Sequence, residues 1–181
     1  TPPTSLEQLL ATTCPTRTVA FDTALAPGGP AEVLNKTVLD VCDGSFGGLR
    51  AAVHGASRVI CLEDRPRQRA HVLSALHTMP RTAAKTVSLW AGAAEGEPWS
   101  MQDWGLVDVL VGDGFYEQLV GVPLWQPLNF WYLRTAVHPI LAPTATIVPC
   151  QARVMVAGVQ FDHVEFAVAH GTVGAPGGFS H

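Results

Sequence analysis

Short apolar runs alternate with longer stretches of mixed polarity along most of the chain. Each apolar run is only four or five residues long, which is the length of a buried strand and too short for a helix. We expect strands over residues 38–41, 59–62, 86–90, 107–111 and 144–148. The first four carry almost no polar positions, as is typical of strands that are buried on both faces of a sheet.

The stretches between these runs have the spacing of helices. We expect helices over residues 46–54, 68–79 and 127–141, with Pro127 tolerated in the first turn of the last one. Strands that alternate with helices predict an α/β fold, in which a parallel, doubly wound sheet is covered on both faces.

The two ends of the chain have a different character. Residues 4–7 form a capping-box pattern that predicts a helix to about residue 11, and residues 26–30 form a Pro/Gly turn. After Pro149, residues 152–159 and 163–168 are β-like with no helix between them. We therefore divide the chain into an N-terminal helix and linker at 1–30, an α/β module at 31–149 and a β element at 150–181. The first residue is not methionine and the last eleven are loop-like, so we expect a piece of a longer polypeptide.

Composition excludes several classes of protein. The net charge of -4 disfavours nucleic acid as a partner, because phosphate binding requires a clustered basic face. No apolar run approaches the roughly 20 residues of a membrane helix, and no signal peptide is evident. The four cysteines and seven histidines show no metal-ligand spacing, so we expect no metal. We expect an intracellular protein of the cytoplasm, with the nucleus as a second compartment.

Polar residues at the ends of the expected strands suggest a nucleoside site. Asp40 ends the first strand, and Gly44 lies in the glycine-containing turn that follows it. Glu63 follows the second strand, where an acid can accept from ribose hydroxyls, and Glu95 follows the third, where it can accept from an adenine amine. Because ligands bind outside the carboxyl ends of parallel strands, these four residues sketch an adenosyl pocket. The alternative is that the glycines only let a helix pack closely while both glutamates are exposed turn acids.

Three blocks of sequence carry a resemblance to a known family. They are residues 43–45 with 59–63, residues 110–115, and the long block 124–137. These blocks resemble class I S-adenosylmethionine-dependent methyltransferases, and specifically the protein arginine methyltransferase family. The similarity is to the second, degenerate module found in tandem-module members, and it extends from about residue 37 to the end. It implies a Rossmann-like sheet followed by the start of a β-barrel, with S-adenosylmethionine as cofactor.

The chain departs from the pattern of active family members in two places. Cys42 and Phe46 replace the first and third glycines of the nucleotide loop, and Phe46 is expected to crowd the methionine part of the cofactor. Asp113 stands where the first of two substrate-binding glutamates is expected, and no acid stands at the second position, near Val122. We therefore assign no catalytic residue, treat Asp113 as a degenerate remnant, and expect weak or absent cofactor binding.

The resemblance implies a fragment of a protein arginine N-methyltransferase. This piece is then a catalytically silent module that packs against a catalytic module of the same chain or of a second subunit, while the parent modifies protein substrates. The alternative is a noncatalytic scaffold subunit of a larger complex, and a working small-molecule methyltransferase fits the loop poorly. On the helix at 127–141 we expect the aromatic residues to cover the sheet and Arg134 to face Asp113.

Overall fold

A sheet of five parallel strands forms the centre of the protein. The computed structural model describes residues 15–41, 46–63, 66–90, 105–112 and 129–151. The strands follow the order β3-β2-β1-β4-β5 across the sheet. Their bounds are Thr37–Asp40 (β1), Arg58–Leu62 (β2), Val87–Trp90 (β3), Val107–Val111 (β4) and Leu141–Val148 (β5). The predicted parallel sheet is confirmed.

The central strand β1 shows why these residues form a sheet that is covered on both faces. Val38 pairs in register with Val59 of β2 on one side and with Val109 of β4 on the other. All three side chains are fully buried. Successive side chains of a strand point to opposite faces, so a strand that is apolar throughout needs cover on both sides.

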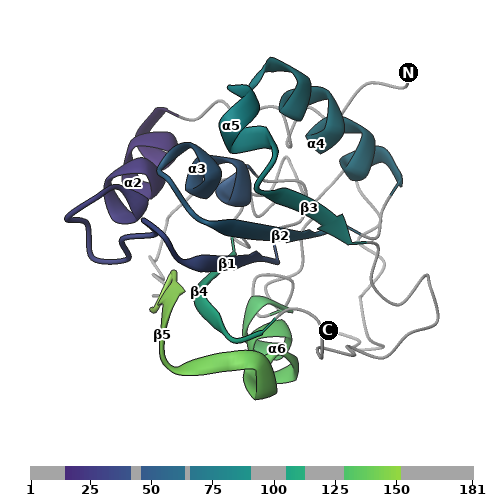
Figure 1. Cartoon of the computed structure of the whole chain (residues 1–181). Helices are drawn as coiled ribbons and strands as arrows, with labels where there is room; N and C mark the ends of the chain where they lie inside the picture. The colour runs from purple at the N-terminus through teal and green to yellow at the C-terminus, as the bar shows by residue number, and fades with distance from the viewer. Residues whose placement is uncertain (1–14, 42–45, 64–65, 91–104, 113–128, 152–181) are drawn as a thin grey trace, which may run out of the picture. The chain divides into compact units, whose positions relative to one another are not determined.

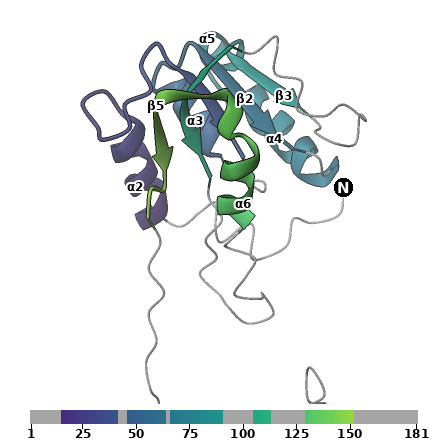
Figure 2. The ribbon, with the colours of Figure 1, turned by 90° about the horizontal axis from the view of Figure 1, so that it is seen from below.

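Helices provide this cover on both faces (Figure 1). The helices α2, α3, α4 and α5 lie on one side of the sheet and α6 lies on the other, and the turned view in Figure 2 separates α6 from α4. Their bounds are Pro15–Leu25 (α2), Gly47–Val53 (α3), Pro66–Thr78 (α4), Arg81–Ala84 (α5) and Asn129–Ala136 (α6), followed by a 3-10 turn at His138–Ile140 (η3). The arrangement is the expected doubly wound α/β fold.

Two apolar clusters fill the spaces between the helices and the sheet. The first joins Val38, Val59 and Val109 to side chains from α2, α3 and α5. The second joins the alternate strand positions to side chains from α6 and the residues after it, and its buried members are Leu39, Val41, Ile60, Val107, Leu110, Phe130, Val137 and Ile140. The strands therefore divide their side chains between two cores.

The α2 helix is held on α3 by polar contacts as well as by apolar packing. Asp22 accepts a hydrogen bond from Arg50 at 2.8 Å through one carboxylate oxygen, and its other oxygen lies 3.2 Å from His54 Nε2. Arg50 also donates to the Thr18 hydroxyl at 3.2 Å. Thr18 and Asp22 are four residues apart on α2, and Arg50 and His54 are four residues apart on α3 and its C-cap. Residues at this spacing lie on one face of a helix, which lets the two pairs meet.

The long helix expected over residues 127–141 is wrong at its C-terminal end. The α-helix ends at Ala136, a 3-10 turn follows, and Leu141 already belongs to β5, which was expected to begin at residue 144. Pro139 explains the break, because it lacks a backbone N–H and disfavours helical backbone at the residue before it. Pro143 does not interrupt β5, since β5 lies at the edge of the described sheet and one side of its backbone needs no ladder partner there.

Sequence reasoning missed two helices, α2 and α5. The α2 segment is rich in threonine, which has a weak helix propensity, and its Phe21 and Leu25 were too few to reveal an apolar face. The α5 helix is a single turn. The helix expected at residues 4–11 and the β element expected after Cys150 lie almost entirely outside the described residues. The proposed division into three segments therefore stays a prediction.

Candidate functional site at the carboxyl edge of the sheet

Two buried carboxylates lie on neighbouring strands at the carboxyl edge of the sheet. Asp40 ends β1 and is 3% exposed, while Glu63 directly follows β2 and is 4% exposed. Asp40 pairs in register with Cys61, two residues before Glu63. The strand order reverses between β1 and β4, which is the point where ligands bind in open α/β sheets. The structure therefore brings together two of the four residues predicted to form a nucleoside site.

The Asp40 carboxylate holds the start of α3. Its Oδ2 atom accepts a short hydrogen bond from the backbone amide of Gly48, in the first turn of the helix. Glycine is needed at position 48, because a Cβ atom there would lie 2.7 Å from Cys61 Sγ and 2.8 Å from Asp40 Oδ2. An amide at a helix start can bind an anionic ligand, and here the protein's own carboxylate accepts from the Gly48 amide.

Glu63 extends the ladder between β2 and β3 by one residue. Its backbone amide donates to the carbonyl oxygen of Trp90 at 2.8 Å. This bond fixes the position of the backbone from which the buried Glu63 side chain leaves β2. A carboxylate at this place is suited to accept hydrogen bonds from two vicinal hydroxyls.

Burial raises the pKa of the Cys61 thiol well above its usual range, and the nearby Asp40 and Glu63 carboxylates raise that pKa further. A negative thiolate would be costly in a dry position beside two acids. Cys61 is therefore a neutral, packed thiol beneath the site rather than a nucleophile. Cys61 is 4% exposed, whereas Cys42 lies outside the described residues.

Phe46 immediately precedes α3 and connects it to α4. Its ring stacks on the ring of His71, with centroids 5.1 Å apart and planes inclined by 27°. The residue makes no side-chain hydrogen bond that could cap the helix. The position at which active relatives are expected to carry a glycine thus carries an aromatic ring that joins the start of α3 to α4.

Phe130 of α6 packs on the end of β4. A Cβ atom at Gly112 would overlap the Phe130 ring and would lie 3.2 Å from Val41 Cγ2. The Gly112 amide also donates to Val148 O at 2.8 Å, which joins β4 to β5 at this edge. Sequence reasoning missed this contact, although a glycine that closes an apolar strand signals close approach of another group.

The aromatic residues of α6 do not all cover the sheet, contrary to expectation. Phe130 is 3% exposed and belongs to the second core, and Trp131 packs against it only in part. Tyr132 is 71% exposed. A helix presents only about a third of its surface to a sheet, so three consecutive residues cannot all be buried there.

Several predicted site residues lie outside the described residues. They are Gly44, Glu95 and Asp113, so the expected contact between Arg134 and Asp113 stays a prediction. Within the described ranges, no group of three or more His, Cys, Asp or Glu side chains could hold a metal ion. None of the helices that the structure describes has the length and apolar character needed to span a membrane.

The sequence is similar to one curated arginine methyltransferase. Over 123 residues it is 32% identical to protein arginine N-methyltransferase 7 of Danio rerio. The match covers 68% of this chain and 17% of that protein, so the chain spans about a sixth of the relative's length. No protein-family model matches the chain.

Solved structures of arginine methyltransferases share the fold. Protein arginine methyltransferase 10 of Arabidopsis thaliana superposes with a TM-score of 0.53 at 19% identity, covering 78% of this chain and 36% of that one. The enzyme–prozyme heterotetrameric complex of protein arginine methyltransferase 1 from Trypanosoma brucei, with AdoHcy, gives a TM-score of 0.52 at 17% identity, covering 77% and 40%. The fold is therefore that of the class I S-adenosylmethionine-dependent methyltransferases. Together with the sequence similarity, it shows that the chain belongs to the protein arginine methyltransferase family.

Proposed function

We propose that the chain is a supporting module of a protein arginine N-methyltransferase. In this proposal the parent protein transfers methyl groups from S-adenosylmethionine to arginine residues of protein substrates. The module described here keeps the methyltransferase fold, packs against a catalytic module and does not transfer methyl groups itself. It corresponds to the second, degenerate module of tandem-module members.

The observation that carries this proposal is that the groups at the start of α3 are already engaged within the protein. Phe46 stands at a glycine position of the nucleotide loop, and its ring is engaged with His71. The Gly48 amide is engaged with Asp40. A loop that must approach a ligand through bare backbone needs residues without a Cβ atom, and Phe46 and Cys42 both carry one.

The residues present fit one end of the cofactor better than the other. Glu63, buried at the end of β2, would hold the ribose hydroxyls, and Glu95 would accept from the adenine amine. Gly44 lacks a Cβ atom and would let the loop backbone approach the ligand, while Asp40 would act indirectly by fixing α3. When bound, S-adenosylmethionine would supply an electrophilic methyl group. At the methionine end, Cys42 and Phe46 replace the expected glycines, and this supports weak or absent binding.

The substrate side of the site supports the same proposal. Two carboxylates orient a guanidinium group and draw its positive charge away from the attacking nitrogen. This chain offers Asp113, which is one methylene shorter than glutamate, and no second acid near Val122. Misplacement of a reacting group by about 1 Å can lower a rate on the order of a hundredfold.

A partner is part of the proposal. The partner is a catalytic methyltransferase module, either in the same polypeptide or in a second subunit. One structural neighbour is an enzyme–prozyme heterotetrameric complex, which supports the idea that members of this fold assemble with related chains. That neighbour equally favours the alternative function, a noncatalytic scaffold subunit. An upstream module with the full glycine loop and paired glutamates in the same reading frame would favour the supporting module, and its absence would favour the scaffold.

Coexpression with the catalytic module tests the proposal. We expect the tagged chain to retain that module on an affinity column and to increase its transfer of labelled methyl groups to arginine peptides. The chain alone should transfer none above a no-enzyme blank. Methyl transfer by the chain alone would overturn the proposal, and absence of association would overturn the supporting role.

The compartment is also a proposal. We propose the cytoplasm as the main location of the parent protein and the nucleus as a second one, because the free thiols of Cys61 and Cys150 suit a reducing compartment. Fractionation of cells that express the tagged parent tests this, and recovery in the secretory fraction would contradict it.

A further inference from the structure

The segment 66–85, which comprises α4 and α5, is uniformly basic. It contains four of the chain's 11 Lys and Arg residues, two of its seven His residues and none of its 15 Asp and Glu residues. The chain as a whole has a net charge of -4. This segment therefore carries a local excess of positive charge in a chain whose net charge is negative.

These two helices are also poorly covered. Among the described side chains of α4, only Val72 is buried. Leu73 is 44% exposed although it is a large apolar residue. An amphipathic helix with a single fully buried side chain among those described leaves much of its surface open, as is typical of an interaction surface.

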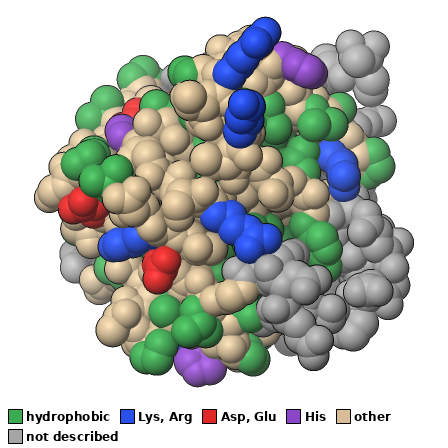
Figure 3. All heavy atoms as spheres, in the orientation of Figure 1, with side chains coloured by type: hydrophobic (Ala, Val, Ile, Leu, Met, Phe, Trp, Pro, Cys, Tyr) green, Lys and Arg blue, Asp and Glu red, His purple; other side chains and the backbone are tan. Residues whose placement is uncertain are grey.

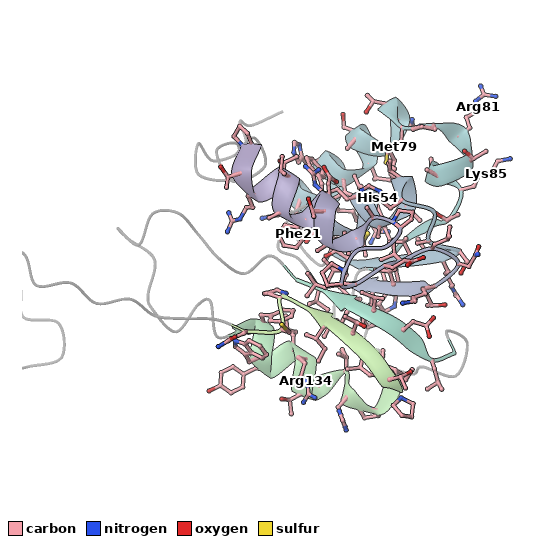
Figure 4. The ribbon with its side chains drawn as sticks, turned by 90° about the vertical axis from the view of Figure 1, so that its left-hand side faces the viewer. Phe21, His54, Met79, Arg81, Lys85 and Arg134 are labelled. Carbon is pink, nitrogen blue, oxygen red and sulfur yellow. The ribbon has the colours of Figure 1, made fainter. Side chains whose placement is uncertain are left out.

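Two cations of this segment are exposed, and Arg69 is half-buried. Arg81 and Lys85 are exposed and lie four residues apart, and Figure 4 shows both pointing away from the sheet at the same end of the molecule. In Figure 3, basic side chains and a histidine gather over α4 and α5. No ion pair joins Arg69, Arg81 or Lys85 to another residue of the described part of the chain. We call the surface formed by Arg69, Leu73, His77, Arg81 and Lys85 the α4–α5 face.

We propose that the α4–α5 face binds an acidic polypeptide segment that carries an apolar residue. The carboxylates of such a segment would lie over Arg81, Lys85 and Arg69, and its apolar side chain would cover Leu73. Charge complementarity identifies the partner, because an exposed cationic surface without internal acids attracts an anion and repels cationic segments. The proposal does not depend on whether the module is catalytically silent.

A peptide fits this face better than nucleic acid does. Single strands of nucleic acid are bound on exposed aromatic rings beside a basic groove. The described part of α4 and α5 contains no Phe, Tyr or Trp, and the ring of His71 is stacked on Phe46. A long polyanion would also meet the negative charge that dominates the rest of the chain. A short acidic segment needs only the local field, which extends about 10 Å at moderate salt.

Binding of a labelled oligoglutamate peptide with a central leucine tests the proposal. The readout is fluorescence anisotropy with the full chain at low ionic strength. We expect saturable binding that weakens as salt is added, because salt screens contacts between exposed charges. The Arg81→Glu variant should bind about tenfold more weakly, since it replaces an attraction with a repulsion. Its fold should be kept, because an acid at the first position of a helix is favourable.

Arg134→Glu is the matched control, because it makes the same change of charge in α6, on the opposite side of the sheet. We expect the Arg134→Glu variant to bind the peptide as the unchanged chain does. A third variant, Leu73→Ser, tests the apolar contact. It should weaken binding of the leucine-containing peptide more than binding of plain oligoglutamate. Equal losses in Arg81→Glu and Arg134→Glu would overturn the proposal, as would absence of binding at low salt. Tighter binding of an RNA oligonucleotide of the same length would also overturn it, in favour of a nucleic-acid surface.

Discussion

Gly112 shows how a single missing Cβ atom sets the position of a helix. The Phe130 ring occupies the space that a side chain at residue 112 would need. We predict that Gly112→Ala lowers the free energy of unfolding by about 1–3 kcal/mol, as overpacking of a close-packed site does. Thermal and denaturant unfolding measure this loss. In a Phe130→Ala background the same substitution should cost much less, because contacting residues are not additive. Equal costs in both backgrounds would contradict the contact.

Cys61 offers a second prediction at the scale of one residue. Because burial raises the pKa of its thiol, Cys61 should not react with a thiol reagent in the native chain at neutral pH, whereas the exposed Cys150 should react readily. A chain with Cys14 and Cys42 replaced by Ser isolates the two thiols. One fast equivalent is expected, and a second only after unfolding. Two fast equivalents at neutral pH would contradict a buried, protonated Cys61.

The raised pKa of Cys61 also predicts how stability changes with pH. In the unfolded chain the thiol ionises near its ordinary pKa of about 8.5, whereas in the folded chain it stays protonated at that pH. The contribution of Cys61 to stability is therefore complete below this pH and is lost as pH rises above it. Replacing Cys61 with Ala should flatten the alkaline decline of the unfolding midpoint. An unchanged decline would show that other groups cause it.

The sequence predicts which residues lie at the carboxyl ends of strands. This prediction is reliable where the strand is a continuous apolar run that ends at a polar residue. Asp40 and Glu63 lie on neighbouring strands at one edge of the sheet, and their role in a nucleoside site stays a prediction. The bond between Asp40 and the Gly48 amide and the stacking of Phe46 on His71 could not be foreseen. Both depend on the angle at which helices cross the sheet, which is set by packing and not by local pattern.

At the scale of elements, three consecutive aromatic residues of α6 differ in burial, and their Ala variants test how the helix is oriented on the sheet. Phe130 is buried, Trp131 is partly buried and Tyr132 is largely exposed. Phe130→Ala should cost about 3–5 kcal/mol, because it empties a packed site. Trp131→Ala should cost less, and Tyr132→Ala should stay within about 0.5 kcal/mol, as surface substitutions do. Denaturant unfolding of the three variants checks the order, and a Tyr132→Ala cost equal to that of Phe130→Ala would show that α6 is wrongly oriented.

The strands were more predictable than the helices for a physical reason. A strand buried on both faces is a continuous apolar run, and its ends are visible where polar residues begin. The ends of helices depend on caps and on proline, as the break near Pro139 shows. The α2 helix depends on polar contacts of Asp22 with α3, which are tertiary contacts and leave little trace in the local sequence.

At the scale of the whole molecule, the sheet order and the two cores explain how the fold could persist in a module that does not transfer methyl groups. Glu63, the described residue that would contact a cofactor, belongs to neither core. A module can therefore lose its loop glycines and keep its stability. Family membership follows from fold and sequence together, whereas the proposed catalytic silence rests on a few positions at one edge of the sheet.

Calorimetric titration of the chain with S-adenosylmethionine tests the central claim most directly. An active arginine methyltransferase in the same buffer serves as the positive control. The account predicts no saturable heat for this chain at cofactor concentrations that saturate the control, because Phe46 and Cys42 prevent close approach of the loop. A dissociation constant in the low micromolar range, about -8 kcal/mol of binding free energy, would contradict it.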